Sequence, residues 1–199
     1  MGVLTKGHVI TCSDRNRRGG IKAIYLGEVA NVTSATIGTA ANTHTFTSIG
    51  GFVTTGGAYM YKFEFDRETA YYTANATREN GSTVVETELG FTIPKITSEV
   101  NARLENLKDS CGLFAIVETY ATDATDVTYK FVLGYDNIFS PDAFLEFGSG
   151  EQNSGTALQD PNETVVKLTG VMAEYPREYD ASGNGVEIET TGDQSYILS

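Results

Sequence analysis

The residues that most often carry catalysis or bind metals are few in this chain. It has two histidines, His8 and His44, and neither lies near a serine, cysteine or carboxylate cluster of the kind that supports nucleophilic catalysis. The two cysteines, Cys12 and Cys111, are far apart and belong to no Cys-x-x-Cys or Cys/His group, so the sequence predicts free thiols rather than a zinc site or a disulfide. We expect Cys111 to be a small packing residue.

Two oxygen-rich patterns could act on a sugar or hold a cation. Glu86 and Glu88 form a carboxylate pair such as glycosidases use, but residues two apart on a strand share one face, which favours a solvated surface. The segment from Asp180 to Gly185 resembles the start of a calcium loop, yet Thr191 stands at the twelfth position, where a bidentate carboxylate is needed. We therefore predict a polar turn there, and no catalytic, cofactor-binding or metal-binding residue.

The charge of the chain is strongly acidic. Lysine and arginine number 14 and aspartate and glutamate number 26, which gives a formal net charge of −12. Such a surface opposes general binding to phosphate backbones, although an acidic wall also lets a polyanion slide past without sticking. Arg15, Arg17 and Arg18 form a basic cluster that could bind phosphate or pair with acidic residues of an adjacent subunit, and we favour the neighbour.

The length and composition describe a folded protein with a core of its own. We treat residues 1–199 as a single domain, and the hydrophobic share of 40% is typical of a folded chain rather than a disordered one. The stretch from Met1 to Ile10 has no apolar run long enough for a signal peptide, and no segment approaches the length of a membrane span. We expect a protein that is made and used in a cytoplasm.

Alternation of apolar and polar side chains, the pattern of half-buried strands, dominates the chain. Between Tyr59 and Phe65 the odd positions are aromatic, and between Thr83 and Ile93 the apolar positions alternate with acidic ones. Asn80-Gly81 predicts the turn of a long hairpin, because both residues adopt positive φ readily. Further strands are expected at Ile21–Gly27, His44–Ile49, Leu113–Thr119, Val127–Leu133 and Thr164–Met172.

One helix and three loops complete the expected elements. From Thr97 to Lys108 the apolar residues recur at helical spacing, with Thr97 or Ser98 as a cap and Gly112 as a stop. Polar composition predicts loops at Ser34–Asn42 and Phe147–Asn162 and a polar C-terminal tail at about residues 180–199. The predicted fold is mainly β: an antiparallel β-sandwich or half-barrel with one flanking α-helix at about residues 97–108.

The order of these parts resembles that of phage tail tube proteins. Gly19 to Leu26 followed by Asn31 to Ser34 looks like the opening of structural proteins from tailed bacteriophages, and the aromatic strand, the hairpin, the helix and the next two strands follow in that family's order. The resemblance covers residues 10–180 and implies a virion subunit, synthesised in the host cytoplasm, that assembles with copies of itself into stacked rings. On this hypothesis we expect contacts with other tail or neck proteins. The acidic strand faces independently suggest an acidic channel, with Glu86 and Glu88 or similar acids on its wall, through which DNA passes without specific binding.

Other functions remain open at the level of sequence. A neck or tail completion protein, or a head decoration protein, would give the same pattern. A monomeric carbohydrate- or ligand-binding β-sandwich would use tyrosines as stacking platforms, with Tyr71, Tyr72, Tyr129 and Tyr135 as candidates. An enzyme is the least favoured hypothesis, because the histidine and cysteine constellations that catalysis uses are missing.

Overall fold

The chain folds into a mainly β structure with one α-helix, as predicted. The computed structural model describes residues 19–40, 43–52, 58–79, 81–122, 127–138, 140, 142–180, 186–190 and 194–198. The helix is α1 (Ser98–Asp109), and a short 3-10 turn, η2, spans Val29–Asn31. The strands are β1 (Ile21–Glu28), β2 (Ser34–Ile37), β3 (Thr45–Gly50), β4 (Met60–Phe63), β5 (Tyr71–Glu79), β6 (Ser82–Pro94), β7 (Leu113–Thr122), β8 (Thr128–Leu133), β9 (Leu145–Asn153), β10 (Glu163–Met172), β11 (Arg177–Tyr179), β12 (Val186–Thr190) and β13 (Gln194–Leu198).

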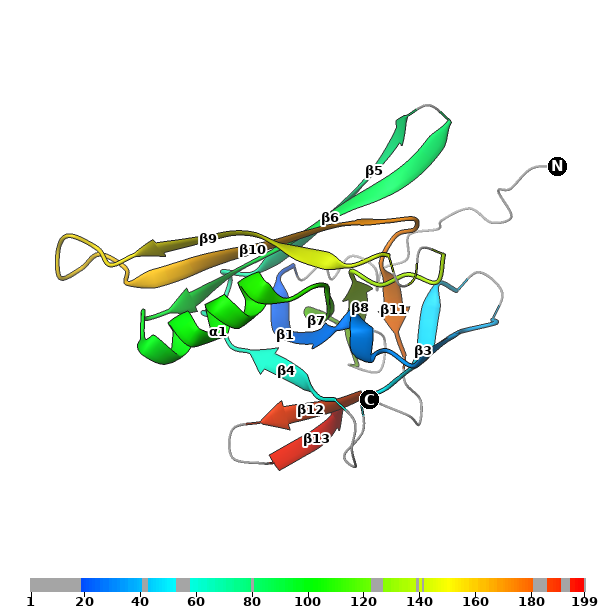
Figure 1. Cartoon of the computed structure of the whole chain (residues 1–199), viewed down its shortest axis with the longest axis horizontal. Coiled ribbons are helices and arrows are strands. Elements are labelled where there is room, and N and C mark those ends of the chain that lie inside the picture. Colours follow the sequence, from blue (N-terminus) through cyan, green and yellow to red (C-terminus); the bar gives the residue numbers. More distant parts are fainter. Residues whose placement is uncertain are drawn as a thin grey trace.

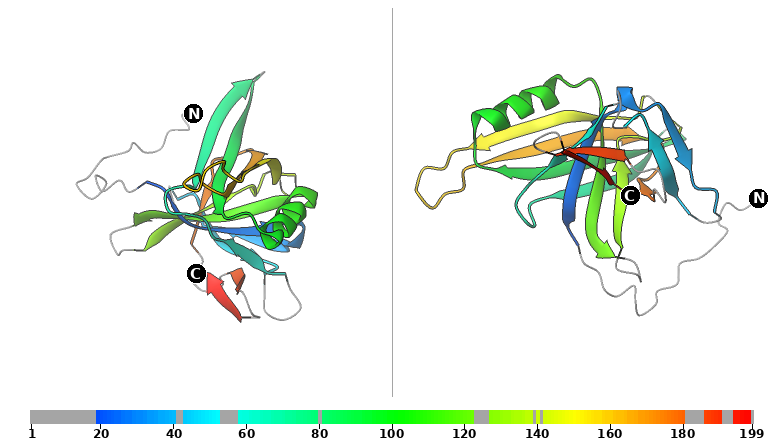
Figure 2. Two further views of the ribbon diagram at one scale, coloured as in Figure 1. Left: turned by 90° about the vertical axis from the view of Figure 1, so that its left-hand side faces the viewer. Right: turned by 90° about the horizontal axis from the view of Figure 1, so that it is seen from below.

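The strands form a long sheet that branches at β7. One path runs β13-β12-β4-β1-β7-β8-β11-β3-β2, and a second, β5-β6-β10-β9, joins β7 through the pair Leu113 and Leu145. Pairing is antiparallel except between β11 and β3 and between β12 and β4. Figure 1 shows the β5-β6 and β9-β10 hairpins extending from the body in opposite directions, and Figure 2 shows how far the β5-β6 hairpin stands clear of it.

The central strands β1 and β7 are buried on both faces, so they separate two hydrophobic cores. Ile24 and its partner Val117 belong to one core, and Tyr25 and its partner Ile116 belong to the other. The first is covered by the inner face of the β5-β6-β10-β9 branch and the second by Phe46, Met60 and the C-terminal strands. A strand buried on both faces needs a continuous apolar run, and the residues Leu113 to Val117 supply one.

Helix α1 closes the side of the core under β9. Its cap is the predicted one, because Thr97 Oγ1 accepts a hydrogen bond of 3.1 Å from the backbone N–H of Val100. Leu104 and Leu107 pack against the core formed by β1, β6, β7 and β10. The helix begins and ends within one residue of the prediction.

The two predicted loops are in part strands, and the tail prediction is corrected in the same way. Ser34–Ile37 is β2, paired with β3; the first seven residues of the segment 147–162 belong to β9; and the tail contains β12 and β13. Most of these strands lie at sheet edges, whereas β12 lies between β13 and β4, and in each case a neighbouring strand supplies the hydrogen bonds. Val186 and Leu198 are buried, and the Val186 N–H donates to the Tyr179 hydroxyl at 3.0 Å. Burial raises the pKa of Tyr179 to about 12.

The aromatic strand is also corrected in its orientation. Within Tyr59 to Phe65 only Met60–Phe63 forms a strand, and Met60 is fully buried whereas Tyr61 is 52% exposed. The reason is that β4 lies between β1 and β12, which turns Met60 toward Phe46 and Phe114 in the second core. Phe63 and Phe65 pack against the first core, so only part of the predicted aromatic face is covered.

A buried carboxylate ties together three strands. Glu118 on β7 is 7% exposed and accepts hydrogen bonds from Lys22 Nζ at 2.7 Å and Thr128 Oγ1 at 2.6 Å. Burial by itself raises the pKa of this carboxyl, but the hydrogen bonds from Lys22 and Thr128 outweigh burial, so the pKa is lowered from its ordinary value of 4.5.

The lowered pKa predicts acid sensitivity that depends on Glu118. A carboxyl with a lower pKa in the folded than in the unfolded protein stabilises the fold fully above pH 4.5, and this contribution is lost as the pH falls through the folded-state value. We expect Glu118→Gln to lose about 1–3 kcal/mol of unfolding free energy at neutral pH and much less at about pH 3. Urea unfolding at both pH values measures this. Glu105→Gln, which removes an exposed carboxylate paired with Lys108, is the control and should change little at either pH.

Candidate assembly surface

The β5-β6-β10-β9 sheet has one apolar and one solvent-facing side. On β6, Val85, Leu89 and Phe91 are buried, as the alternation predicted, and on β10 Val166 and Leu168 lie beside them. The opposite face of β6 carries an exposed Glu86 and a half-buried Glu88, which confirms that both acids point to solvent. We call this solvent-facing side, from β5 to β9, the acidic face.

A bulge in β9 adds acids that the sequence did not predict. Ser149 pairs with Lys167 and Phe147 pairs with Leu168, so Gly148 is an extra residue in the ladder. In a regular strand Glu146 and Glu151, five positions apart, would point to opposite faces. Because the bulge shifts the alternation by one residue, both lie on the acidic face. Nothing in the local sequence except Gly148 signals this shift.

One carboxylate of the acidic face, that of Glu88, contacts both a tyrosine and a lysine. The Tyr71 hydroxyl donates to Glu88 Oε1 at 2.5 Å, and Lys167 Nζ lies 3.8 Å from the same oxygen. The hydrogen bond to the Glu88 carboxylate, more than burial, raises the pKa of Tyr71. The Tyr71 ring covers Gly90, its partner across the strands, where an added Cβ would lie 2.5 Å from the ring. The acidic face is therefore an ordered surface.

The acidic face ends in two strand edges. Among the described residues β5 pairs only with β6, and β9 pairs with β10 and, on its other side, only at Leu145 with β7. Helix α1 flanks β9, and the Gln152 side chain donates to Asn101 Oδ1 at 2.6 Å. Unpaired backbone groups along two edges form a template for pairing with another chain.

The β5-β6 hairpin extends one edge beyond the body. Glu79 and Ser82 are the last paired residues, so the two-residue connection Asn80-Gly81 lies where the sequence predicted it. Gly81 has φ +85°, as such a turn requires, and Asn80 lies outside the described residues. Residues 75–78 and 81–83 are exposed, so the end of the hairpin projects into solvent on both faces.

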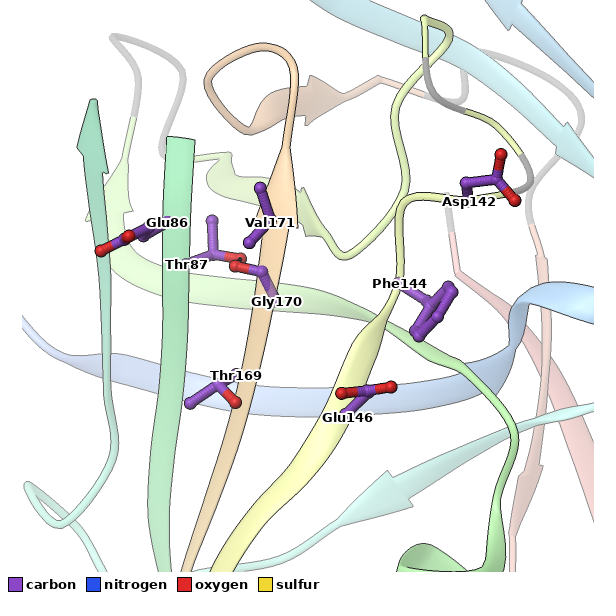
Figure 3. Close-up of a pocket in the computed structure, with 8 residues that line it drawn as sticks. All are labelled: Glu86, Thr87, Asp142, Phe144, Glu146, Thr169, Gly170 and Val171. Carbon is purple, nitrogen blue, oxygen red and sulfur yellow. Dashed lines mark hydrogen bonds between the residues drawn. The ribbon is translucent and has the colours of Figure 1, made fainter. Parts of the chain in front are cut away.

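A depression of about 410 Å³ lies on the acidic face near the end of β10. Figure 3 shows that its walls come from three segments: β6, the end of β10 and the residues that lead into β9. Val171 is 48% exposed there, and Thr87 Oγ1 donates to the Gly170 carbonyl at 3.1 Å. The lining residues are Glu86, Thr87, Asp142, Phe144, Glu146, Thr169, Gly170 and Val171.

Among the described residues, the candidates for catalysis or metal binding do not gather into a reactive site. His44 Nε2 lies 2.8 Å from the Tyr175 carbonyl and 3.8 Å from Glu174, and the described part of the chain holds no group of three or more metal-ligating side chains. Cys111 is exposed, so the expectation that it packs is wrong; it follows the end of α1 in a turn where little covers it. Several other predictions fall outside the described residues, namely those on His8, Cys12, Arg15, Arg17, Arg18, residues 181–185 and Thr191.

The four candidate stacking tyrosines are dispersed. Tyr71 is 42% exposed on the acidic face, whereas Tyr72, the next residue, points inward against Phe131. Tyr129 stacks on the same Phe131 ring at a centroid distance of 6.4 Å, and Tyr135 is buried in the second core. They do not form one exposed aromatic platform.

Comparisons with protein-family models, with curated proteins and with solved structures find no significant match to this chain. Among the described residues no helix is long and apolar enough to cross a membrane.

Proposed function

We propose that this chain is a virion structural subunit that assembles with copies of itself into rings, and that the rings stack into a phage tail tube. The observation that carries the proposal is the β5-β6-β10-β9 sheet, which combines two open edges with an acidic solvent-facing side. The protein would act by assembly alone, without catalysis, a cofactor or a membrane, and its site of action would be the virion after synthesis in the host cytoplasm.

The strand directions suit closure into a ring. Successive strands of the β5-β6-β10-β9 sheet are antiparallel, so β5 and β9 also run in opposite directions. The β5 edge of one subunit can therefore pair with the β9 edge of the next in the antiparallel arrangement that continues the sheet. Repetition of this contact around an axis removes both free edges of the β5-β6-β10-β9 sheet, which turns an aggregation liability into the assembly contact.

The acidic face suits the wall of a channel for DNA. It carries the carboxylates of Glu86, Glu146 and Glu151, together with Glu88, whose charge is offset by the nearby Lys167. A wall of this net charge repels phosphates, and the lysine on it, Lys167, is paired with Glu88, so it offers DNA little cationic surface to bind. If the sheet closes with this face inward, DNA passes without specific recognition.

Two neighbouring strand edges can be tested by crosslinking. We expect Thr73→Cys on β5 and Ser149→Cys on β9, both exposed on the acidic face, to join different copies through a short bismaleimide. Within one chain three strand spacings separate them by about 14 Å, so a short reagent reports contacts between chains. The readout is a ladder on a denaturing gel that stops at the ring size, in a background with Cys12 and Cys111 changed to serine.

Electron microscopy of the purified protein over a concentration series completes this test. Tubes with a central channel support the proposal, and single rings that never stack favour a neck or tail completion protein. A sample that stays monomeric at high concentration and forms no β5 to β9 crosslink would sink the proposal and favour a monomeric ligand-binding domain. As a control, Thr73→Cys paired with Glu105→Cys on the exposed side of α1 should give no ladder.

A further inference from the structure

The two ends of the acidic face differ in chemistry. At one end the residues 154–162 join β9 to β10, and at the other lies the depression beside Val171 and Phe144. Figure 1 shows the β9-β10 connection and the start of β9 at opposite ends of these long strands. A contact between the two ends would join one copy to the next along the strand direction.

The β9-β10 connection presents a leucine on an ordered loop. Asp160 Oδ2 accepts three hydrogen bonds of 2.8 Å, from the backbone N–H groups of Thr156 and Ala157 and from the Thr156 hydroxyl. These bonds lower the pKa of Asp160, so the loop keeps them at neutral pH. Leu158 lies inside this turn and is fully exposed, at 107% of its reference area. A leucine held in solvent by an ordered loop is arranged for contact rather than for the core of its own chain.

A lysine is fixed at the base of the same loop. Lys95 has φ +63°, a conformation unfavourable for residues other than glycine. Asn162 holds it there, because its carbonyl accepts from the Lys95 N–H at 2.7 Å and its side chain accepts from the Ile96 N–H at 2.9 Å. The Lys95 side chain is exposed. This end of the sheet therefore offers one apolar side chain and one cation.

The depression at the opposite end of the strands is complementary to Leu158 and Lys95, because it offers apolar surface and carboxylates. Val171 and Phe144 supply apolar surface, and Glu86, Asp142 and Glu146 line the same depression. The Val171 side chain is 48% exposed, so it lacks a covering partner within its own chain. A hollow lined by both apolar and acidic side chains fits an apolar side chain accompanied by a lysine.

We propose that Leu158 of one copy inserts into the depression of a second copy, with Lys95 beside the carboxylates of the rim. Because the two surfaces lie at opposite ends of the same strands, the contact is head to tail and repeats from copy to copy. It rests on the proposed function, for which it supplies the contact between stacked rings. The β5 to β9 contact builds each ring, and the Leu158 contact joins one ring to the next.

A matched pair of truncations tests the contact. Leu158→Ala removes the inserted side chain, and Gln159→Ala shortens its exposed neighbour in the same loop. Burial of a leucine side chain corresponds to roughly a tenfold to hundredfold change in affinity, so the concentration at which stacks form should rise at least tenfold for Leu158→Ala and little for Gln159→Ala. Sedimentation and electron microscopy provide the readout. Single rings should persist in both variants, and equal stacking by both would overturn the inference.

Crosslinking separates this inference from the proposed function. Two single-cysteine proteins, Leu158→Cys and Val171→Cys, are prepared with Cys12 and Cys111 changed to serine and treated with a short bismaleimide. We expect a dimer only when the two are mixed. A dimer in pure Leu158→Cys would show symmetric pairing of the loops, and no dimer in the mixture would show no contact; either result overturns the inference. The β5 to β9 crosslink, measured separately, decides whether rings form.

Discussion

Gly134→Ala is expected to lose at least about 3 kcal/mol of unfolding free energy, among the largest effects of any single methyl group in this protein. Gly134 has φ +73° and follows β8 at the junction of the two sheet branches. An added Cβ would lie 2.5 Å from Leu145 Cγ, 2.8 Å from the Leu145 nitrogen and 2.9 Å from the Leu113 carbonyl oxygen. Leu113 and Leu145 form the pair that joins β7 to β9, so the methyl group would push the acidic face away from the body.

Gly81→Ala is the matched control for Gly134→Ala. Gly81 has a similar φ of +85°, but a Cβ there would meet nothing within 4 Å. This variant should lose only the backbone strain of about 1–2 kcal/mol. Thermal unfolding measures both, and for a chain of this length about 3 kcal/mol corresponds to roughly 6–12 °C in Tm. Equal losses of unfolding free energy in the two variants would show that the close contacts around Gly134 destabilise Gly134→Ala no further than backbone strain does.

Asp136→Ala is expected to lose about 2–5 kcal/mol of unfolding free energy. Asp136 is fully buried, and its two carboxylate oxygens accept from the backbone N–H groups of Ile138 and Ala173, each at 2.8 Å. Loss of the carboxylate leaves both N–H groups, which are partly buried, without this acceptor. Ala173 follows the last residue of β10, so the change also releases the end of the strand that carries Val171.

Two further variants refine the Asp136 prediction. Asp136→Asn keeps the shape but offers one acceptor oxygen, so it should lose roughly half as much as Asp136→Ala. Asp142→Asn changes an exposed carboxyl six positions further along the chain and should leave stability unchanged within about 0.5 kcal/mol. Urea unfolding gives the free energies, and amide hydrogen exchange at Ala173 reports the released strand end. Full protection of that amide in Asp136→Ala would contradict the prediction.

The residue that makes the fold sensitive to acid and the residues of the proposed assembly surface lie in different parts of the molecule. Glu118 stabilises the packing of β1, β7 and β8 and lies outside the acidic face, so its protonation lowers stability without changing the charge of the proposed channel wall. The carboxylates of the acidic face contribute little to stability, because solvent screens them. Substitution of Glu151 should therefore alter what the face repels and leave the fold intact.

The β class, the hairpin at Asn80-Gly81 and the helix with its Thr97 cap could be predicted because each depends on residues close together in the sequence. Alternation reports which side of a strand is apolar, a positive φ favours asparagine or glycine at a tight turn, and a cap needs a side-chain oxygen near the helix start. For the same reason Glu86 and Glu88 could be placed on one solvent-facing side, because two residues that are two positions apart on one strand point to the same face.

The polar strands were missed because their stability comes from partners far away in the chain. β2 pairs with β3 and β9 pairs with β10, and those hydrogen bonds leave little apolar signature in the strand itself. β12 does alternate apolar and acidic residues, but one of its two partners, β4, lies far away in the chain. The exposed side of Tyr61 and the burial of Met60 depend likewise on which strands flank β4.

The sequence by itself determined the local elements, the acidic charge and the scarcity of catalytic groups. Only the tertiary structure decided that Glu146 and Glu151 join Glu86 on one face, because that depends on the bulge at Gly148 and on pairing with β10. It also placed Leu158 and the depression at opposite ends of the same strands. Register and long-range pairing are set by contacts among many strands at once, so no single segment of sequence specifies them.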